Sequence, residues 1–231
     1  MCGRFTQLWT WAELQGYFSM FMPGASNFQP EYNLAPTREI WALMPEGDGL
    51  KLSRARWGLV PAWWSKPFKD LPSAFNARAE SAAEKPFFRS AFKQRRCIIP
   101  VSGFYEWTGA KGARKPHYFT RRDGKPTFLA ALFEDHEDAA TGEATTSTVV
   151  LTCAANGFMS HFHDRMPVIL EPDRVQAWVE KGDPALLSPA AEDVLQEWAV
   201  DPKVNSSRYQ GEDAIDPWEE MPTLGLAQPK G

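Results

Sequence analysis

The chain places a cysteine at its second position, in the run Met1-Cys2-Gly3. Loss of Met1 would leave a free amine and a thiol on adjacent carbons of one residue. This pair suits aldehydes: the amine condenses to an imine, and the tethered thiol then closes a five-membered thiazolidine ring. Cys2 is therefore a candidate for covalent capture of a carbonyl compound. The alternative for the same residue is a small buried hydrophobe.

Such chemistry needs groups that move protons, and two residues in apolar segments qualify. Glu106 lies between Tyr105 and Trp107, where burial would favour its protonated form and fit it to exchange protons near neutrality. His163 precedes a short polar turn and could act as a general acid. The alternatives are a water-facing strand end for Glu106 and a plain loop residue for His163, with His161 as a neighbouring rival.

A third candidate group is Asn76-Ala77-Arg78, which interrupts an apolar stretch. Asn76 offers an amide that could orient a substrate, and Arg78 offers a guanidinium that could grip a phosphate. The alternative is a turn asparagine followed by a surface arginine.

The charge of the chain is unevenly distributed. Between Lys51 and Lys125 there are 17 Lys and Arg against 5 Asp and Glu, whereas the remaining residues carry 8 against 24. Positive charge for phosphates and flat rings for bases occur together in proteins that bind single-stranded nucleic acid. The aromatic residues of this basic block are Trp57, Trp63, Trp64, Phe87, Phe88, Phe92 and Trp107. Core packing is the alternative role for these rings.

Length and composition favour one intracellular domain. At 231 residues, with no linker or repeat, residues 1–231 are expected to form a single domain with a flexible tail at about 225–231. Three cysteines without paired or zinc-like spacing predict no disulfide and no metal. No signal peptide or apolar span is apparent, which favours a cytoplasmic protein.

Strand-like segments dominate the middle of the chain, and helices are expected near its ends. Strands are predicted at 41–44, 52–60, 97–107, 117–120, 127–132, 147–153 and 167–170, with Asp123-Gly124 as a hairpin turn. Helices are predicted from a capping box at Thr10 to about Met20, from Pro86 to Arg95, at 173–180, and at 189–198 behind Ser188. This pattern predicts an α+β domain with a curved, mainly antiparallel, barrel-like sheet flanked by helices.

Six motifs, taken in order, resemble one known family. They are MCGRF (1–5), YNLAPT (32–37), RWGLVPAWW (56–64), FNARAES (75–81), RCIIPVSGFYEW (96–107) and HDRMPVIL (163–170). This set resembles the SRAP family, the SOS-response-associated proteins that process abasic sites. The resemblance spans nearly the whole chain. It departs at Asp201, where the family often has serine.

The resemblance implies a function and a set of roles. Cys2, freed by loss of Met1, would crosslink to the ring-opened aldehyde of an abasic site in single-stranded DNA as a thiazolidine. Asn76 would position the amine and sugar, Glu106 would exchange protons, and His163 would act as an acid toward the sugar oxygen. Self-removal of Met1 and abasic-site lyase activity are also implied. DNA contacts are expected from Arg4, Asn33, Trp63, Trp64, Arg78 and Arg165, with Cys97 and Cys153 in the core. No cofactor is expected, and the protein is expected to be a monomer.

Two alternative functions use the same residues differently. An N-terminal-nucleophile amidohydrolase of the glutamine amidotransferase type would use Cys2 to attack an amide, although Asn156-Gly157 is followed by Phe158 rather than the aspartate of that signature. A noncatalytic single-strand binder would leave Cys2 a bystander and would show salt-sensitive binding without a covalent adduct.

Overall fold

A small closed barrel forms one half of the molecule. The computed structural model describes residues 2–18, 20–21, 29–110, 112–138 and 141–219. The barrel strands are β4 (Glu39–Glu46), β5 (Gly49–Trp57), β7 (Arg96–Val101), β10 (Thr127–Glu137) and β11 (Ala144–Ala154). Neighbours around the ring are antiparallel, except that β11 meets β5 in parallel and closes it. Four short strands extend this sheet: β2 (Met20–Phe21), β6 (Asn76–Arg78), β12 (Arg165–Pro167) and β13 (Ile169–Leu170).

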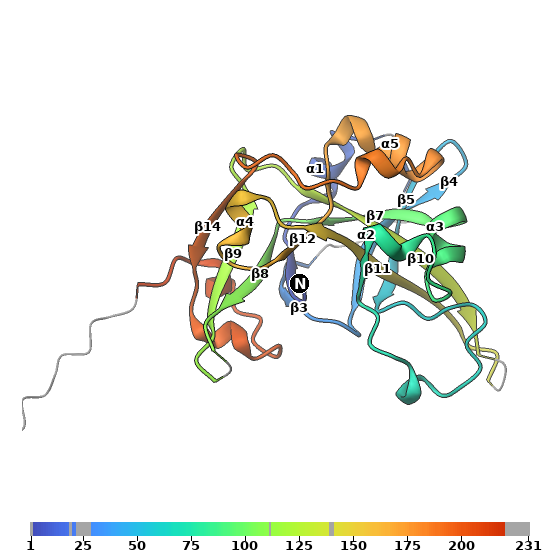
Figure 1. Ribbon diagram of the computed structural model, residues 1–231, viewed down its shortest axis with the longest axis horizontal. Coiled ribbons are helices and arrows are strands. Elements are labelled where there is room, and N and C mark those ends of the chain that lie inside the picture. The colour runs from blue at the N-terminus through green and yellow to red at the C-terminus, as the bar shows by residue number, and fades with distance from the viewer. Residues whose placement is uncertain (1, 19, 22–28, 111, 139–140, 220–231) are drawn as a thin grey trace, which may run out of the picture.

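A second, five-stranded sheet stands beside the barrel (Figure 1). Its order is β14 (Leu195–Ala199), β9 (Lys115–Arg121), β8 (Gly103–Thr108), β1 (Phe5–Gln7) and β3 (Glu31–Leu34), and all of its pairs are antiparallel. One face of this sheet belongs to the main core, whereas its other face carries Tyr105 and Tyr118 in a smaller cluster. The predicted α+β fold with a barrel-like, mainly antiparallel sheet is confirmed.

Helices are few and short in the described part of the chain. The α-helices are α1 (Trp11–Gln15), α2 (Ala79–Ala82), α3 (Arg89–Gln94), α4 (Gly157–Ser160) and α5 (Pro172–Lys181). The 3-10 helices are η1 (Phe68–Asp70), η2 (Pro184–Leu186), η3 (Pro202–Asn205) and η4 (Glu212–Ile215). The capping box is confirmed, because Thr10 and Glu13 cap each other's backbone reciprocally. That helix nevertheless ends at Gln15 rather than near Met20, which lies in β2 beside β5.

The continuous strand predicted at 97–107 is two strands in two different sheets. The chain leaves the barrel at Ser102, whose backbone N–H donates to Thr6 O at 2.9 Å. The hairpin predicted at Asp123-Gly124 is also wrong as a pairing. The turn exists, with Gly124 at φ 70°, but β9 pairs with β8 and β14 while β10 pairs within the barrel. The Asp123-Gly124 sequence therefore predicted the turn correctly, but the turn connects strands of two different sheets instead of two paired strands.

Two further boundaries differ from the prediction. The helix predicted at 189–198 is wrong, because Leu195–Ala199 pairs with β9 as the edge strand β14. Tertiary pairing here overrides a sequence that also fits a helical period. The helix predicted at 173–180 is confirmed as α5, while the predicted strand at 167–170 is interrupted at Val168 between β12 and β13.

Arg96 joins two helices to the barrel. Its guanidinium is buried and donates to carbonyls at the C-terminal ends of both α3 and α5. The acceptors are the oxygens of Phe92, Lys93, Trp178, Val179 and Glu180, at 2.6 to 3.2 Å. Carbonyls in the last turn of a helix are short of backbone donors, and Trp178 O here also accepts from Gly182 N, so one cation serves two helix ends and complements both dipoles. Other cations of the basic block also bind groups within the protein. With Arg96, they are Arg54, Arg95 and Arg121.

We expect Arg96→Met to lower the free energy of unfolding by about 3 kcal/mol, because the buried carbonyls lose their donor. The free energy of unfolding of Arg96→Lys should lie between those of the wild type and Arg96→Met, since an ammonium cannot reach all five oxygens. Urea unfolding measures both. The matched control is Arg174→Met on α5, whose side chain is 63% exposed and which should change stability by less than about 0.5 kcal/mol. Equal effects of Arg96→Met and Arg174→Met would contradict this role.

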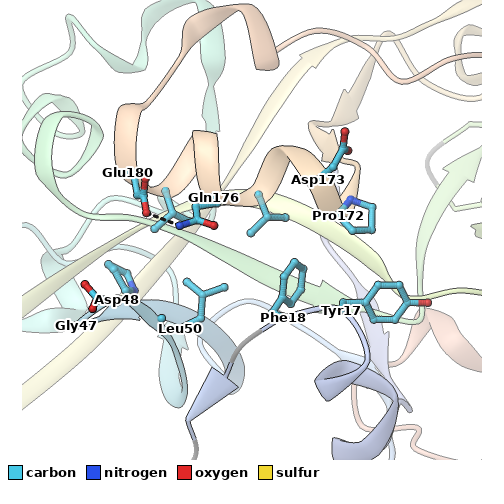
Figure 2. A pocket seen from close by; sticks show the side chains of 13 residues that line it. Tyr17, Phe18, Gly47, Asp48, Leu50, Pro172, Asp173, Gln176 and Glu180 are labelled. Atoms are coloured by element: carbon cyan, nitrogen blue, oxygen red, sulfur yellow. Dashed lines mark hydrogen bonds between the residues drawn. The ribbon is translucent and has the colours of Figure 1, made fainter.

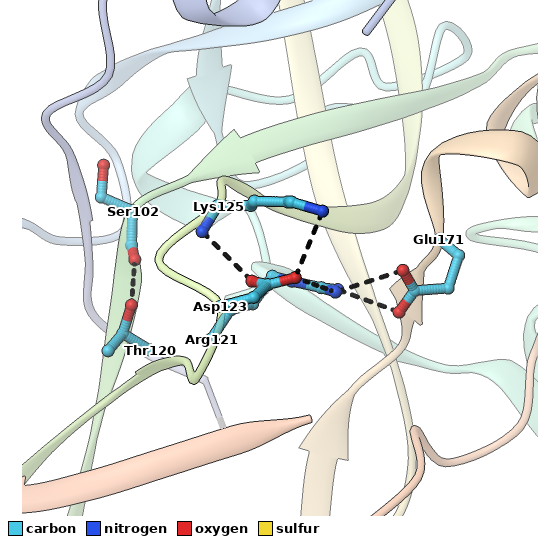
Figure 3. A network of polar contacts seen from close by, with 6 residues as sticks. All are labelled: Ser102, Thr120, Arg121, Asp123, Lys125 and Glu171. Atoms are coloured by element: carbon cyan, nitrogen blue, oxygen red, sulfur yellow. Dashed lines mark hydrogen bonds and ion pairs between the residues drawn. The ribbon is translucent and has the colours of Figure 1, made fainter. Parts of the chain in front are cut away.

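A second arginine ties the end of β9 to the start of α5 (Figure 3). Arg121 donates to both carboxylate oxygens of Asp123 at 2.9 and 3.0 Å, and to those of Glu171 at 2.9 and 3.2 Å. The hydrogen bond from Arg121 lowers the pKa of Asp123 to about 2. Glu171 is the N-cap residue directly before α5, so this network connects the second sheet to a helix that contacts the barrel.

The low pKa of Asp123 predicts an acid-sensitive contribution to stability. The carboxylate stabilises the fold fully above its ordinary pKa of 3.8, and this contribution is lost as pH falls from there through about 2. Because the side chain is 38% exposed and therefore screened, we expect Asp123→Asn to cost only about 1 kcal/mol at pH 6. Urea unfolding should show that difference shrinking toward zero near pH 2. A difference that persists undiminished at that pH would refute this assignment.

Candidate functional site

Cys2 and Asn76 meet although 74 residues separate them. The Asn76 side chain donates from Nδ2 to the Cys2 carbonyl oxygen at 2.8 Å. Asn76 reaches this position because β6 pairs in parallel with β11, with Asn76 opposite Val150. Its Oδ1 is buried and has no hydrogen-bond partner among the described residues. The amide therefore holds the backbone of Cys2 and keeps one acceptor available beside it.

The segment that carries Cys2 runs beside β8. Tyr105 N donates to Arg4 O at 2.9 Å, and Phe5 lies opposite Phe104 in the ladder. Cys2 is completely buried. Burial raises the pKa of its thiol, and the nearby carboxylate of Glu106 raises it further. The thiol is therefore held in its protonated form, mainly by burial. Met1 lies outside the described residues.

Glu106 and His163 line one open cavity of about 630 Å³. Glu106 is only 3% exposed, and it reaches this cavity from β8. The other lining residues come from the chain start, β8 and the loops around the opening: Gly3, Arg4, Phe75, Trp107, Gly109, Gly112, Arg114 and Asn205. The structure thus brings together all four predicted catalytic residues. Glu106 and His163 line the cavity, and Cys2 and Asn76 lie beside it, joined by a hydrogen bond.

His163 is held at the turn after α4. The backbone N–H of Arg165 donates to His163 Nδ1 at 2.9 Å, which places the proton of a neutral imidazole on Nε2. Asp164 Oδ1 lies 2.8 Å from the same Nδ1, so a carboxylate is in reach when the ring is protonated. The rival His161 is exposed at the end of α4. His163 is accordingly the histidine placed to exchange a proton with a molecule in the cavity.

Arg4 and Asn33 form one internal unit. Arg4 donates to Asn33 Oδ1 at 2.8 Å and to the carbonyl of Val204 at 2.9 Å, and its guanidinium lies 5.6 Å from the Trp107 ring centroid. Asn33 is 1% exposed and donates to three carbonyls of residues 204–209. Asn33 therefore orients Arg4 at the cavity, and direct contact of Asn33 with DNA stays a prediction. Asp201 caps the neighbouring η3 by accepting from Lys203 N.

The two remaining arginines differ in availability. Arg165 makes a two-pronged ion pair with Glu80, at 2.6 and 2.8 Å, and donates to Thr152 O, so its charge is compensated within the protein. Arg78 is exposed at the end of β6, two residues beyond Asn76. Arg78 is thus the better placed of the two to meet a phosphate.

The predicted base-stacking tryptophans lie on the segment between β5 and β6. Trp63 is 58% exposed, and its ring contacts Trp64 at 6.1 Å and Phe87 at 6.2 Å between centroids. Trp64 is half-buried. By contrast, Trp57 is fully buried in the core, as the alternative role for the aromatic residues allowed. The exposed ring of Trp63 is accessible to a base, and its contact with DNA stays a prediction.

A second cavity lies elsewhere and holds none of the predicted site residues. Figure 2 shows it between α5 and the turn from β4 to β5, with Phe18 and Leu50 facing Gln176. Its volume is about 240 Å³. Among the described residues there is no group of three or more His, Cys, Asp or Glu arranged for a metal ion, and no helix there is long and apolar enough to span a membrane. Cys97 and Cys153 are buried in the core, as predicted.

Comparison with known proteins identifies the family. The family model described as SOS response associated peptidase (SRAP) matches residues 1–207. The chain belongs to the SRAP family. Abasic site processing protein YoaM of Bacillus subtilis is 32% identical over 229 residues, covering 96% of this chain and 100% of that protein. Abasic site processing protein YedK of Escherichia coli is 29% identical over 185 residues, covering 78% and 80%.

Two solved structures resemble this chain in fold. A Bordetella bronchiseptica protein superimposes with a TM-score of 0.75 at 27% identity, covering 87% of this chain and 100% of that one. A Bacteroides thetaiotaomicron protein gives a TM-score of 0.74 at 21% identity, covering 82% and 86%, and shows likeness of fold alone.

Sequence reasoning missed several residues around this SRAP cavity. Arg114 lines it from the loop between β8 and β9, and Asn205 accepts a hydrogen bond from Trp107 Nε1 at 2.6 Å. His117 and Glu197 lie close by on β9 and β14. Only the basic composition of the central block pointed to Arg114. Glu197 was assigned to a helix that does not exist, so no sequence signal could pair it with the site.

Proposed function

We propose that this protein processes abasic sites in single-stranded DNA by forming a covalent crosslink through Cys2. Membership of the SRAP family and relatives named abasic site processing proteins support this proposal. The single observation that carries it is the convergence of Cys2, Asn76, Glu106 and His163 around one open cavity. A cavity of about 630 Å³ has room for a ring-opened sugar and a phosphate.

The proposed reaction begins after hydrolysis removes Met1. The free amine of Cys2 adds to the aldehyde C1′ of the ring-opened sugar, and loss of one water gives an imine. The thiol then adds to the imine carbon, sulfur bonds to C1′, and the thiol proton moves to nitrogen. The product is a thiazolidine, and the balance over both steps is the loss of one water. Neither step needs an oxidant, a reductant or a metal ion.

Each residue has a role that its position supports. Glu106 takes a proton from the amine or thiol and returns one to the departing hydroxyl, because its charge already opposes ionisation of Cys2. Asn76 holds the Cys2 backbone and offers Oδ1 to the amine. His163 supplies a proton to the sugar oxygen from Nε2. Arg4, Arg78 and Arg114 are the proposed phosphate contacts, and Trp63 the stacking contact for a base.

The same groups support two accessory activities. The imine at C1′ acidifies the C2′ proton, so a placed base could remove that proton and eliminate the 3′ phosphate as a lyase. Hydrolysis of the Met1–Cys2 peptide bond needs a proton donor and acceptor at the same place, which Glu106 provides. We include both activities in the proposed function of this site.

The central prediction concerns a covalent product. The purified protein, mixed with a single-stranded oligonucleotide bearing one abasic site, should give a protein–DNA band that survives heating in denaturant. Cys2→Ala should abolish the band, as should a form whose mass shows that Met1 is retained. Cys97→Ala is the matched cysteine control and should retain it. A band formed by the Met1-containing protein would contradict the aminothiol mechanism.

Other outcomes of this assay point to the alternatives. Salt-sensitive binding without any denaturant-stable band would indicate a noncatalytic single-strand binder. Glutaminase activity without an adduct would indicate an N-terminal-nucleophile amidohydrolase. The structure gives Asn156 a local task, since its side chain caps α4 by accepting from Met159 N at 2.8 Å.

A second prediction isolates the proton-transfer role of Glu106. Glu106→Gln keeps the shape of the side chain but removes its exchangeable proton, so we expect adduct formation to slow by about 100-fold. Noncovalent affinity for the same oligonucleotide should change less than about threefold, because phosphate contacts dominate binding. Single-turnover adduct rates and a binding titration give the two numbers. Equal losses in rate and affinity would argue that Glu106 acts only in the fold.

A further inference from the structure

Glu106 has a cross-strand neighbour that the proposed reaction does not yet use. In the ladder between β8 and β9, Glu106 lies directly opposite His117. Residues opposite each other in an antiparallel pair project from the same face, with Cβ atoms ~5 Å apart. Phe104 and Phe119, two residues along from this pair, stack on that same face at 5.2 Å between centroids. The side chains of His117 and Glu106 therefore start from neighbouring positions on that face of the sheet.

His117 is clamped at both ring nitrogens. Nδ1 lies 2.5 Å from Glu197 Oε1 on β14, and Nε2 lies 2.7 Å from the hydroxyl of Thr108 on β8. The ring also packs edge-on against Phe162, the residue before His163, at 5.1 Å between centroids. The side chains of His117 and Glu197 are only 15% and 20% exposed. A histidine held this way is fixed in place, and its partial burial limits the screening of its interactions by solvent.

The charged groups around His117 make its protonation state consequential. Glu106 faces it from β8, Glu197 from β14, and Lys115 lies two residues away on the same face of β9. His163 is the residue after Phe162, whose ring contacts that of His117. A protonated His117 neutralises Glu197, whereas a neutral His117 leaves Glu197 as an uncompensated negative charge near Glu106. The hydroxyl of Thr108 accepts from the imidazolium but donates to the neutral ring.

We propose that His117 and Glu197 are positioning residues of the reactive site, forming a paired group whose net charge sets how readily Glu106 gives up its proton. This inference rests on the proposed crosslinking function and deepens it. Glu106 touches the reacting atoms, while His117 and Glu197 act through Glu106. Thr108 connects the pair to the rim, because the next residue, Gly109, lines the cavity.

The pair predicts shifts of opposite sign for its two members. Removing His117 leaves the charge of Glu197 uncompensated, so Glu106 holds its proton to a higher pH. Removing the charge of Glu197 takes a negative charge away, so Glu106 releases its proton at a lower pH. A residue that only fills space would give no such sign reversal.

The test is the pH profile of the adduct rate in the full chain lacking Met1, with the abasic single-stranded oligonucleotide. His117→Gln should move the acidic limb of the profile up by about one pH unit, and Glu197→Gln should move it down by a similar amount. The double variant should return toward the wild type. His161→Gln, an exposed histidine nearby, is the matched control and should leave the limb in place. Shifts of the same sign, or none in folded variants, would overturn the proposal.

A DNA-free measurement separates this inference from the proposed function. The ring resonances of His117, followed by NMR against pH in the unliganded protein, should titrate at a different pH in Glu106→Gln than in the wild type. An unchanged titration would refute the coupling even if crosslinking occurs. A changed titration without any adduct would support the coupling and refute the crosslinking function. If His117→Gln fails to fold, Glu197→Gln and this titration still decide the question.

Discussion

The register of β1 against β8 decides where the candidate nucleophile lies. Phe5 opposite Phe104 sets Cys2 beside the end of β8 that carries Glu106. A slip of one residue would send every side chain of that segment to the opposite face of the sheet. Such a slip would turn the Cys2 side chain to the opposite face and leave the buried Glu106 charge without its chemical partner. Burial of Phe5 on the core face opposes the slip, so the apolar core enforces the geometry of the site.

The site also depends on the way the chain is shared between two sheets. Asn76 arrives from the barrel side through β6, and Glu106 arrives from the second sheet through β8. Ser102, where β7 ends and β8 is about to begin, is the crossing between the two. Because both sheets are fixed by their own ladders, the side chains at their junction gain a defined spacing that no loop could supply alone. A thiol and a carboxylate can then be buried together, which would be unfavourable in an isolated segment.

Internal contacts explain why the basic block is less available than its composition suggests. Arg96 and Arg121 hold helix ends and strand ends in place, and Arg95 is paired with Glu134. Two of the exposed cations are placed near the site: Arg78 lies on the same strand as Asn76, and Arg114 lines the cavity. Some cations of a basic stretch therefore stabilise the fold, while others remain free to bind a ligand. Only the contacts of each residue in the structure tell the two kinds apart.

The sequence by itself determined the candidate chemistry and much of the secondary structure. Cys2 next to Met1, the capping box at Thr10, the fold class and α5 all follow from local patterns of residue type and spacing. Tertiary structure alone decided that 96–108 divides between two sheets, that Leu195–Ala199 is a strand, and that His117, which contacts Glu197, lies opposite Glu106. Local propensity reflects neighbours within a turn or two of the chain. Strand pairing joins residues far apart in the chain, such as Phe5 with Phe104 and His117 with Ala199, and its free energy comes from burial and hydrogen bonds that no local window contains.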